Sequence, residues 1–352
     1  MICGEFYSVR PMKTHILPSA FKTICCLSLS LIAGMTLQAQ AQGGIDPIEQ
    51  TRQMARGINV IGYDPLWQDF GKAHFKEYHF KKIKEAGFQT LRVNLQAFGH
   101  MNGDNQLDPA WLKTLDWVVQ NALTNKLTVI LDEHDFNAMG KNADAGKPKL
   151  LAFWSQISER YKNAPDSVIF EILNEPNGKL DDQSWNALFK EALAIIRKNN
   201  PTRNVIIGPS SWNSIHNLSK LELPSADRHI IVTVHYYLPM NFTHQGAPWV
   251  ESTSKLSGIT WGTDEERQRM EKDFAGVQKW ARENNRPIFL GEFGAYDKAD
   301  MTSRARYIGH AARTAESLGW AWAYWQFDGD FILYDMKKDD WVQPIRDALI
   351  PR

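Results

Sequence analysis

Short apolar runs alternate with longer amphipathic segments over most of the sequence. Eight runs are rich in β-branched and aliphatic residues, and two of them, VIFEIL and PIFL, are apolar almost throughout. Runs of this kind are typical of parallel strands that are covered on both faces. The pattern predicts strands over residues 55–60, 90–95, 127–131, 168–173, 204–207, 229–235, 287–290 and 320–325.

The segments between these runs have the features of helices. Asp108 can cap a helix that has Pro109 at its first position, and apolar residues then recur at helical spacing. Ser184 opens a similar helix. Thr263 and Glu266 have the spacing of a capping box at the start of another.

Strands that alternate with helices in this way predict an α/β fold, and eight of them fit a closed (β/α)8 TIM barrel. Because no linker or low-complexity stretch divides residues 44–352, we expect this part of the chain to be a single domain. The structural alternative is an open doubly wound sheet, which normally has a glycine-rich phosphate-binding turn after its first strand. Here the first strand reads RGINVIGYD, which lacks that turn, and the barrel is favoured.

The N-terminal segment has a different composition. Lys13 and Lys22 flank the start of an apolar stretch that is too short, and too interrupted by Ser and Thr, for a membrane span. The stretch is followed by the small-x-small sequence Ala-Gln-Ala at residues 39–41. We expect residues 1–41 to be a cleaved signal peptide, which would make the protein secreted, either extracellular or periplasmic. A buried N-terminal helix is the alternative.

Composition excludes several classes of chemistry. The 40 basic and 40 acidic side chains balance, so the sequence has no net positive charge for binding nucleic acid. A hydrophobic content of 43% argues against disorder. All three cysteines lie within residues 1–41, so a mature chain would have no thiol for catalysis, disulfide formation or metal binding.

Polar and charged residues concentrate at the C-terminal ends of the predicted strands, where barrels of this kind place their chemistry. Core packing alone does not require such a concentration. The residues are Arg92 and Asn94 in the second strand, residues 132–135 after the third, Asn174 and Glu175 after the fourth, His235 and Tyr237 at the sixth, Glu292 after the seventh and Trp325 at the eighth.

Glu175 and Glu292 are the most informative pair. Strands four and seven lie across a barrel mouth from each other, so two strand-end carboxyl groups can face one another over a central cleft. Glycoside hydrolysis uses one carboxylic acid to protonate the leaving oxygen and one carboxylate at the oxocarbenium-like carbon. Either motif alone could be a turn or a strand exit, but together they predict a glycoside hydrolase.

Four motifs and one further stretch make the chain resemble glycoside hydrolase family five of clan A, in particular its bacterial endoglucanases. The motifs are Arg56-Gly57-Ile58-Asn59, Ile172-Leu173-Asn174-Glu175-Pro176, His235-Tyr236-Tyr237 and Gly291-Glu292-Phe293-Gly294, and the stretch is residues 242–249. The resemblance covers nearly all of residues 44–352, and it implies that this barrel is the catalytic domain.

The resemblance also implies roles for individual residues. Glu175 would be the acid/base and Glu292 the nucleophile. The remaining site residues would be Arg92, His134, Asn174, His235, Tyr237 and Trp325, with a non-prolyl cis peptide bond after Trp325. Many family members have two consecutive histidines after strand three, whereas this chain has Asp135 at the second position. The register of His134 and the substrate subgroup stay open for that reason.

The electrostatics of such a pair can be anticipated. Two carboxylates about 5 Å apart repel, so one of the two pKa values rises. Arg92 can pair with Glu292, and Tyr237 can donate a hydrogen bond to it. We therefore expect Glu292 to keep its charge and Glu175 to hold the proton, as a retaining mechanism requires. His235 would orient Tyr237 or Glu175.

Two further groups of residues allow simpler interpretations. Residues 132–135 could suggest a metal site, but adjacent positions at a strand end point to opposite faces, so at most half of them converge. We expect no metal and no cofactor, and we interpret Glu171 as a structural carboxylate behind Glu175. Of the tryptophans at or beyond strand ends, Trp212, Trp249, Trp261 and Trp325, we expect Trp212 and Trp325 to bind substrate by stacking.

The sequence thus predicts a secreted retaining endo-β-1,4-glucanase whose partner is a β-glucan polysaccharide. The same machinery acting on β-mannan, xyloglucan or mixed-linkage glucan is the first alternative. A non-catalytic glycan-binding barrel and a structural surface protein are the alternatives outside enzymes. No nucleic acid or membrane partner is expected after cleavage of the signal peptide, and the oligomeric state is not predicted.

Overall fold

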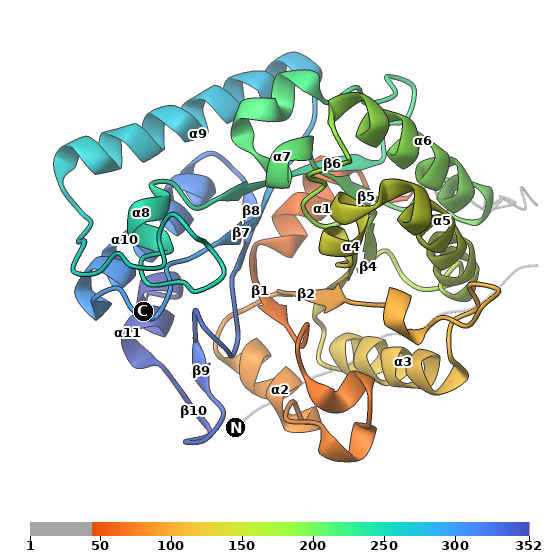
Figure 1. The fold of residues 1–352 in the computed structure, drawn as a ribbon, viewed down its shortest axis with the longest axis horizontal. Helices are drawn as coiled ribbons and strands as arrows, with labels where there is room; N and C mark the ends of the chain where they lie inside the picture. The colour runs from red at the N-terminus through yellow and green to blue at the C-terminus, as the bar shows by residue number, and fades with distance from the viewer. Residues whose placement is uncertain (1–43, 352) are drawn as a thin grey trace, which may run out of the picture. The chain divides into compact units, whose positions relative to one another are not determined.

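The computed structural model describes residues 44–351, and in this part of the chain eight parallel strands close into a barrel (Figure 1). Each strand pairs with its neighbours in sequence, and β1 closes the barrel against β8. The strands are β1 Arg56–Val60, β2 Thr90–Leu95, β3 Thr128–Glu133, β4 Val168–Glu171, β5 Val205–Ile207, β6 Ile230–Tyr236, β7 Ile288–Phe293 and β8 Ala321–Tyr324. The predicted α/β fold and (β/α)8 barrel are confirmed.

All eight predicted strands are present, and their ends differ from the predicted ones by at most three residues. The largest difference is in β7, which continues through Gly291 and Glu292 to Phe293. There the pairing of β6 with β7 steps from Val234–Leu290 to His235–Glu292, so Gly291 is an extra residue in a bulge. Bulges of this kind redirect side chains, and this one brings His235 level with Glu292.

Helices surround the strands, and they follow the predicted caps at two of three positions. Asp108 caps α3 (Pro109–Thr124), and Thr263 forms a capping box with Glu266 at α9 (Asp264–Asn284). The prediction for Ser184 is wrong, because α6 (Asp182–Asn199) is capped by the Asp181 carboxylate, which accepts from the backbone N–H of Ser184. The other helices are α1 Pro47–Met54, α2 Glu77–Glu85, α4 Phe136–Lys141, α5 Ala143–Arg160, α7 Ser210–Asn213, α8 Met240–Thr243, α10 Met301–Ser317 and α11 Gln343–Leu349.

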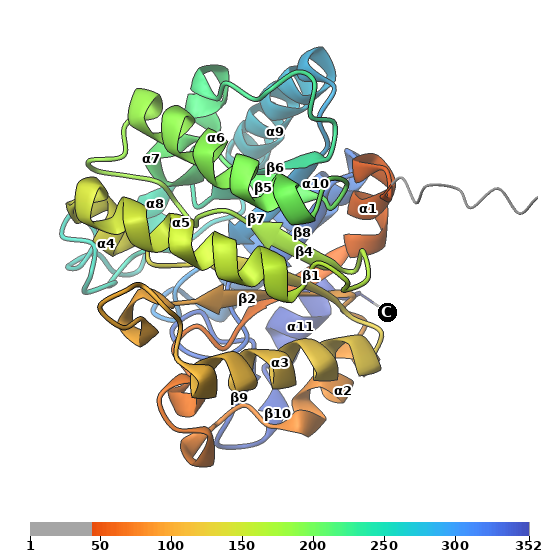
Figure 2. The same cartoon turned by 90° about the vertical axis from the view of Figure 1, so that its right-hand side faces the viewer.

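The barrel interior is filled by aliphatic and aromatic side chains. Ile130, Ile169, Ile206 and Ile231 point inward from four successive strands and are fully buried. Met54 of α1 joins this cluster, and α1 packs against β6 and β8 at one end of the barrel (Figure 2). Because this apolar cluster fills one end of the barrel, we expect functional groups toward the opposite ends of the strands.

Two features near the chain ends complete the description. A short antiparallel pair, β9 (Tyr334–Asp335) and β10 (Asp340–Trp341), follows the barrel and was not predicted. The predicted signal peptide, residues 1–41, lies outside the described residues. Within residues 44–351, no helix combines the length and the apolar character needed to cross a membrane. Secretion therefore stays a prediction.

Candidate active site

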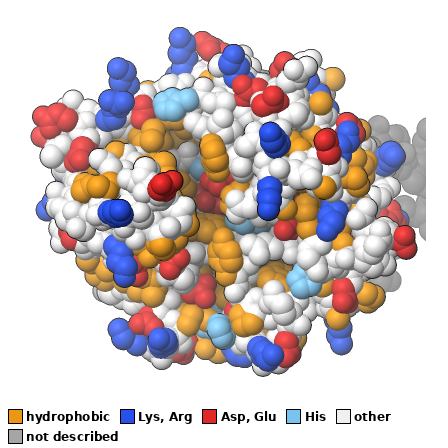
Figure 3. Space-filling view, in the orientation of Figure 1, with side chains coloured by type: hydrophobic (Ala, Val, Ile, Leu, Met, Phe, Trp, Pro, Cys, Tyr) orange, Lys and Arg blue, Asp and Glu red, His pale blue; other side chains and the backbone are white. Residues whose placement is uncertain are grey.

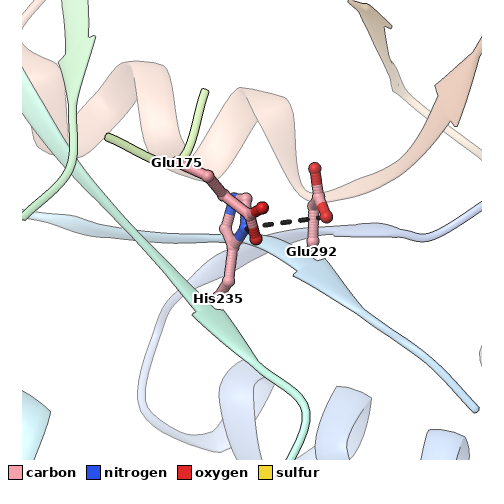
Figure 4. A group of neighbouring side chains, drawn as sticks. All are labelled: Glu175, His235 and Glu292. Carbon is pink, nitrogen blue, oxygen red and sulfur yellow. Dashed lines mark hydrogen bonds and ion pairs between the residues drawn. The ribbon is translucent and has the colours of Figure 1, made fainter. Parts of the chain in front are cut away.

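Glu175, His235 and Glu292 converge at the C-terminal ends of β4, β6 and β7, pointing toward one another (Figure 4). One carboxylate oxygen of each glutamate and one ring nitrogen of His235 lie within 4.8 Å of one another. Figure 3 shows that this face of the molecule is hollowed, with acidic and apolar side chains exposed in the hollow. Oxygens this close fit the ~5–5.5 Å separation of the carboxyl groups in retaining glycosidases better than the ~6.5–9.5 Å of inverting ones.

Arg92 of β2 organises the base of the site. Its guanidinium is fully buried and bonds Glu171 twice, at 2.7 and 2.9 Å, and Glu292 once, at 2.7 Å. It also donates a hydrogen bond of 2.7 Å to Oδ1 of Asn174, which directly precedes Glu175 in the chain. Because the planar guanidinium binds several acceptors at fixed angles, it sets the relative positions of β2, β4 and β7 at the rim.

Two donors to Glu292 favour its charged form. Besides Arg92, the Tyr237 hydroxyl donates to Oε2 of Glu292 at 3.0 Å. Burial raises the pKa of Glu292, and the charge and hydrogen bond of Arg92 oppose that effect. Both contacts anticipated from the sequence are present.

Glu175 lies in a different environment. Its backbone adopts a left-handed conformation with φ 42°, a strained state that is characteristic of functional positions. Oε1 of its carboxyl group lies 2.8 Å from Nδ1 of His235, within hydrogen-bonding distance. Burial and the nearby charge of Glu292 raise the pKa of Glu175 well above its usual range. Because Arg92 bonds Glu292 directly and not Glu175, the first proton taken up by the pair goes to Glu175.

His134 lies within the same network, although Asp135 replaces a second histidine. Nδ1 of His134 is 2.6 Å from Oδ2 of Asp132, and its ring stacks on Trp325 with centroids 5.6 Å apart. Burial lowers the pKa of His134 to about 4, so the ring is neutral. Asp135 instead accepts from the backbone N–H of Phe98 at 2.7 Å and holds a loop. The sequence argument on strand parity is confirmed, because Asp132 and His134 converge and their neighbours do not.

The aromatic residues divide between exposed and buried positions. Trp212 and Trp249 are 55% and 51% exposed, and Tyr63, which the sequence analysis did not single out, is 65% exposed. Although the residue as a whole is exposed, crowding around the Tyr63 hydroxyl and then the charges of Glu292 and Glu175 raise the pKa of the phenol, so the hydroxyl end lies near the two glutamates. Trp261, in contrast, is buried against Tyr307 and is not available for stacking.

Two carboxylates and an imidazole could in principle bind a cation. Glu292, however, already accepts a hydrogen bond from the guanidinium of Arg92, and a second positive charge bound to Glu292 would be repelled by it. The three side chains therefore fit a proton-transfer site better than a metal centre, and we assign them no metal or cofactor.

A model of the cellulase family, glycosyl hydrolase family 5, matches residues 51–330 of this chain. The chain belongs to glycoside hydrolase family five. It is therefore a glycoside hydrolase, and its two strand-end glutamates lie where the family resemblance required them.

Several relatives of this family-five hydrolase are bacterial endoglucanases. It is 31% identical to Endoglucanase H of Acetivibrio thermocellus. The match covers 87% of this chain but only 34% of that longer protein. Among solved structures, endoglucanase Cel5A of Thermotoga maritima is 38% identical, with a TM-score of 0.82 over 87% of this chain and all of that one. The cellulose synthase subunit Z of Clostridioides difficile is 37% identical, with a TM-score of 0.80 over 84% of this chain and 99% of that one.

Two buried asparagines in the hydrolase support the site, and the sequence analysis assigned neither a role. Asn59 donates to the Gly291 carbonyl at 3.0 Å and accepts from Arg92 at 2.8 Å, which links β1 to β2 and β7. Asn213 lies 3.2 Å from Nε2 of His235. Asn59 belongs to the RGIN motif and could have been noticed there, but nothing in the sequence around Asn213 distinguishes it from an ordinary loop residue.

Proposed function

We propose that this protein is a secreted retaining endo-β-1,4-glucanase, with Glu175 as acid/base and Glu292 as nucleophile. The observation that supports the mechanism most directly is the short separation of the two carboxylates, within 4.8 Å, with Arg92 bonded to one of them. An inverting enzyme would need about 6.5–9.5 Å to hold a water between the carboxyl groups.

In the first step, the carboxyl proton of Glu175 passes to the glycosidic oxygen. The bond between that oxygen and the anomeric carbon breaks, and its electron pair goes to the leaving oxygen. A carboxylate oxygen of Glu292 forms an ester with the anomeric carbon from the opposite side. Tyr237 and Arg92 fix the direction of attack, because they bond Glu292 through different oxygens.

In the second step, water replaces the ester. Esterification removes the charge of Glu292, which is one cause of the raised pKa of Glu175. The pKa of Glu175 therefore falls, and its carboxylate remains ionised. It can then accept a proton from water as the water oxygen attacks the anomeric carbon. Glu292 leaves as a carboxylate, the product has the original configuration, and Glu175 again holds the proton.

A glucan is the substrate best supported by the relatives, most of which are named endoglucanases. A mannan is the specific alternative. Thermotoga maritima Cel5A was also crystallised in complex with mannotriose, and the protein in that structure is 36% identical to this chain. The loops beyond the strand ends, including Tyr63 and Trp212, decide between such sugars through their contacts.

A reducing-sugar assay on carboxymethylcellulose, β-mannan, xyloglucan and mixed-linkage glucan tests this proposal. We expect glucan hydrolysis to fall at least ~100-fold in Glu175→Gln and further in Glu292→Gln. Glu283→Gln, an exposed exchange on α9, is the matched control and should retain full activity. Undiminished hydrolysis in both site variants would exclude the mechanism, and binding without cleavage by the native protein would favour a glycan-binding barrel.

Two further measurements test the stereochemistry and the secretion. NMR of the first product formed from a β-glucan should show the β-anomer, because two displacements retain configuration; initial α-anomer would exclude retention. The protein recovered from the culture medium or periplasm should lack residues 1–41 by intact mass. An intact N-terminus in the cytoplasm would contradict secretion.

A further inference from the structure

The loop after β5 contains an unusual turn beside the acid/base residue. Ser211, Trp212 and Asn213 all have positive φ, at 58°, 60° and 52°, although none is glycine. Such backbone persists only where its surroundings enforce it, and it concentrates at functional sites. Here the backbone N–H of Trp212 donates to the Pro176 carbonyl at 3.1 Å, which ties the turn to the residue that follows Glu175.

The turn directs the side chain of Asn213 toward the catalytic histidine. Asn213 is fully buried, and its Nδ2 lies 3.2 Å from Nε2 of His235. A Cβ on Gly208 would lie 2.2 Å from Oδ1 of Asn213, and a Cβ on Gly291 would lie 3.0 Å from Nε2 of His235. Glycine at both positions therefore leaves the space that the amide and the imidazole occupy.

With the amide of Asn213 placed so that Nδ2 faces the ring, the contact assigns the hydrogen of His235 to one nitrogen. Nδ2 is a donor, so Nε2 of His235 accepts, and the hydrogen of the neutral ring is on Nδ1. Nδ1 then donates to Oε1 of Glu175 at 2.8 Å. The other end of the amide, Oδ1 of Asn213, is buried and has no hydrogen-bond partner among the described residues, so the amide orientation rests on the contact of Nδ2 with His235.

We propose that Asn213 is a positioning residue that sets the His235 tautomer. Nδ1–H of His235 then donates a hydrogen bond to Oε1 of Glu175. The acid carries its own proton on Oε2, where the glycosidic oxygen can take it. This inference rests on the proposed acid/base role of Glu175. If the amide were reversed, Nε2 would carry the hydrogen and Nδ1 would accept. The Glu175 proton would then point to the imidazole instead of the substrate.

The same arrangement predicts a direction for the pH dependence. A hydrogen bond from Nδ1 favours ionised Glu175, whereas an accepting Nδ1 favours the protonated acid. Loss of the Asn213 amide should therefore raise the pKa of Glu175. The other titratable groups facing Glu175 and His235 are Glu292, Arg92, Asp132, Glu171, His134 and the phenols of Tyr63 and Tyr237. None of them is changed by the substitution.

Asn213→Gly removes the amide while keeping a residue that tolerates positive φ, and Ser211→Gly is the matched control on the same turn. In Asn213→Gly we expect kcat/KM to fall about tenfold and its basic pH limb to move upward by about one unit. Ser211→Gly should leave that limb in place. An Asn213→Gly profile that superimposes on the native one, at whatever rate, would overturn the proposal.

A measurement without substrate separates this proposal from the proposed function. Ring ¹⁵N shifts of the ¹⁵N-histidine-labelled protein report the tautomer of His235, which is assigned by its absence in His235→Gln. We expect hydrogen on Nδ1 in the native protein and an increased Nε2–H population in Asn213→Gly. Hydrogen on Nε2 in the native protein would refute the role of Asn213, even if both glutamates prove catalytic.

Discussion

Nη1 of Arg92 lies 2.7 Å from Oε1 of Glu292, and the other hydrogen bonds of the same guanidinium go to Glu171, Asn174 and Asn59. One buried cation is thus shared between Glu292, the proposed nucleophile, and the carboxylates of Glu171 and Asp132. Glu175 receives its hydrogen bond from His235, whose pKa is held well below its usual range by burial and by the charge of Arg92. The roles of two chemically identical side chains therefore follow from which one bonds the cation.

Arg92→Lys tests this division. A single ammonium cannot reproduce the bonds to Glu171 and Glu292 together, so the pKa of Glu292 should rise. Because Glu292 must be ionised to attack, the acidic limb of kcat/KM should move to higher pH, with a loss of about 100-fold at the optimum. Arg197→Lys, which weakens the pair with Asp227 at 2.6 Å, is the control and should leave the pH profile unchanged. An unshifted acidic limb in Arg92→Lys would contradict the argument.

Glu171→Gln tests the opposite limb of the profile. Burial raises the pKa of Glu171 to about 7, and its charge is among the causes that raise the pKa of Glu175. Removing that charge should lower the pKa of Glu175, and because Glu175 must be protonated for the first step, the basic limb should move to lower pH. Activity below the optimum should change less than tenfold, since Gln still accepts from Arg92. A basic limb that moves upward would show that Glu171 does not act through its charge.

The rim of the barrel could be predicted from the sequence because strand ends are marked by a change from apolar to polar residues. Glu175 and Glu292 each stand at such a change, Arg92 is a charged residue inside an apolar strand, and a closed parallel barrel brings all strand ends to one face. The end of β7 does not follow from this rule, because its pairing continues past the apolar run through a bulge. A bulge depends on which neighbour a strand pairs with, and the sequence of one strand does not contain that information.

Asn213 shows the other limit of sequence analysis. Its importance comes from a left-handed backbone turn held by a contact to Pro176, 37 positions earlier in the chain. Asn tolerates that conformation, but no local propensity favours Ser211 and Trp212 in it. The exposed Tyr63 was missed for a related reason, since a lone tyrosine in a loop does not show whether it faces the cleft. Both residues depend on tertiary contacts that override local preference.

Trp212→Ala tests the exposed indole as a sugar platform. Trp212 is 55% exposed, so its removal leaves no buried cavity, and stability should change little. Loss of stacking on a sugar ring should raise KM for a soluble glucan about tenfold, corresponding to roughly 1.4 kcal/mol, with kcat nearly constant. Ile48→Ala, which removes a 45%-exposed apolar side chain on α1, should leave KM unaltered. An unchanged KM in Trp212→Ala would remove this residue from the substrate path.

Two glycine substitutions should have opposite effects on stability, and they test how tightly His235 is packed. A Cβ at Gly291 would lie 2.5 Å from Oγ1 of Thr233 and 3.0 Å from Nε2 of His235, so Gly291→Ala must displace one of them. We expect a loss of about 1–3 kcal/mol and reduced kcat, because the bulge that holds His235 beside Glu292 is forced to move.

Gly276 lies within α9, and a Cβ there meets no atom within 4 Å. Gly276→Ala should stabilise the protein by about 0.5–1 kcal/mol through helix propensity alone, with kcat unchanged. Thermal denaturation of both variants, with kcat measured on the same samples, compares the two sites directly. If Gly291→Ala were as stable and as active as Gly276→Ala, the space around the imidazole would be larger than the contacts require, and His235 would not be fixed by packing against β7.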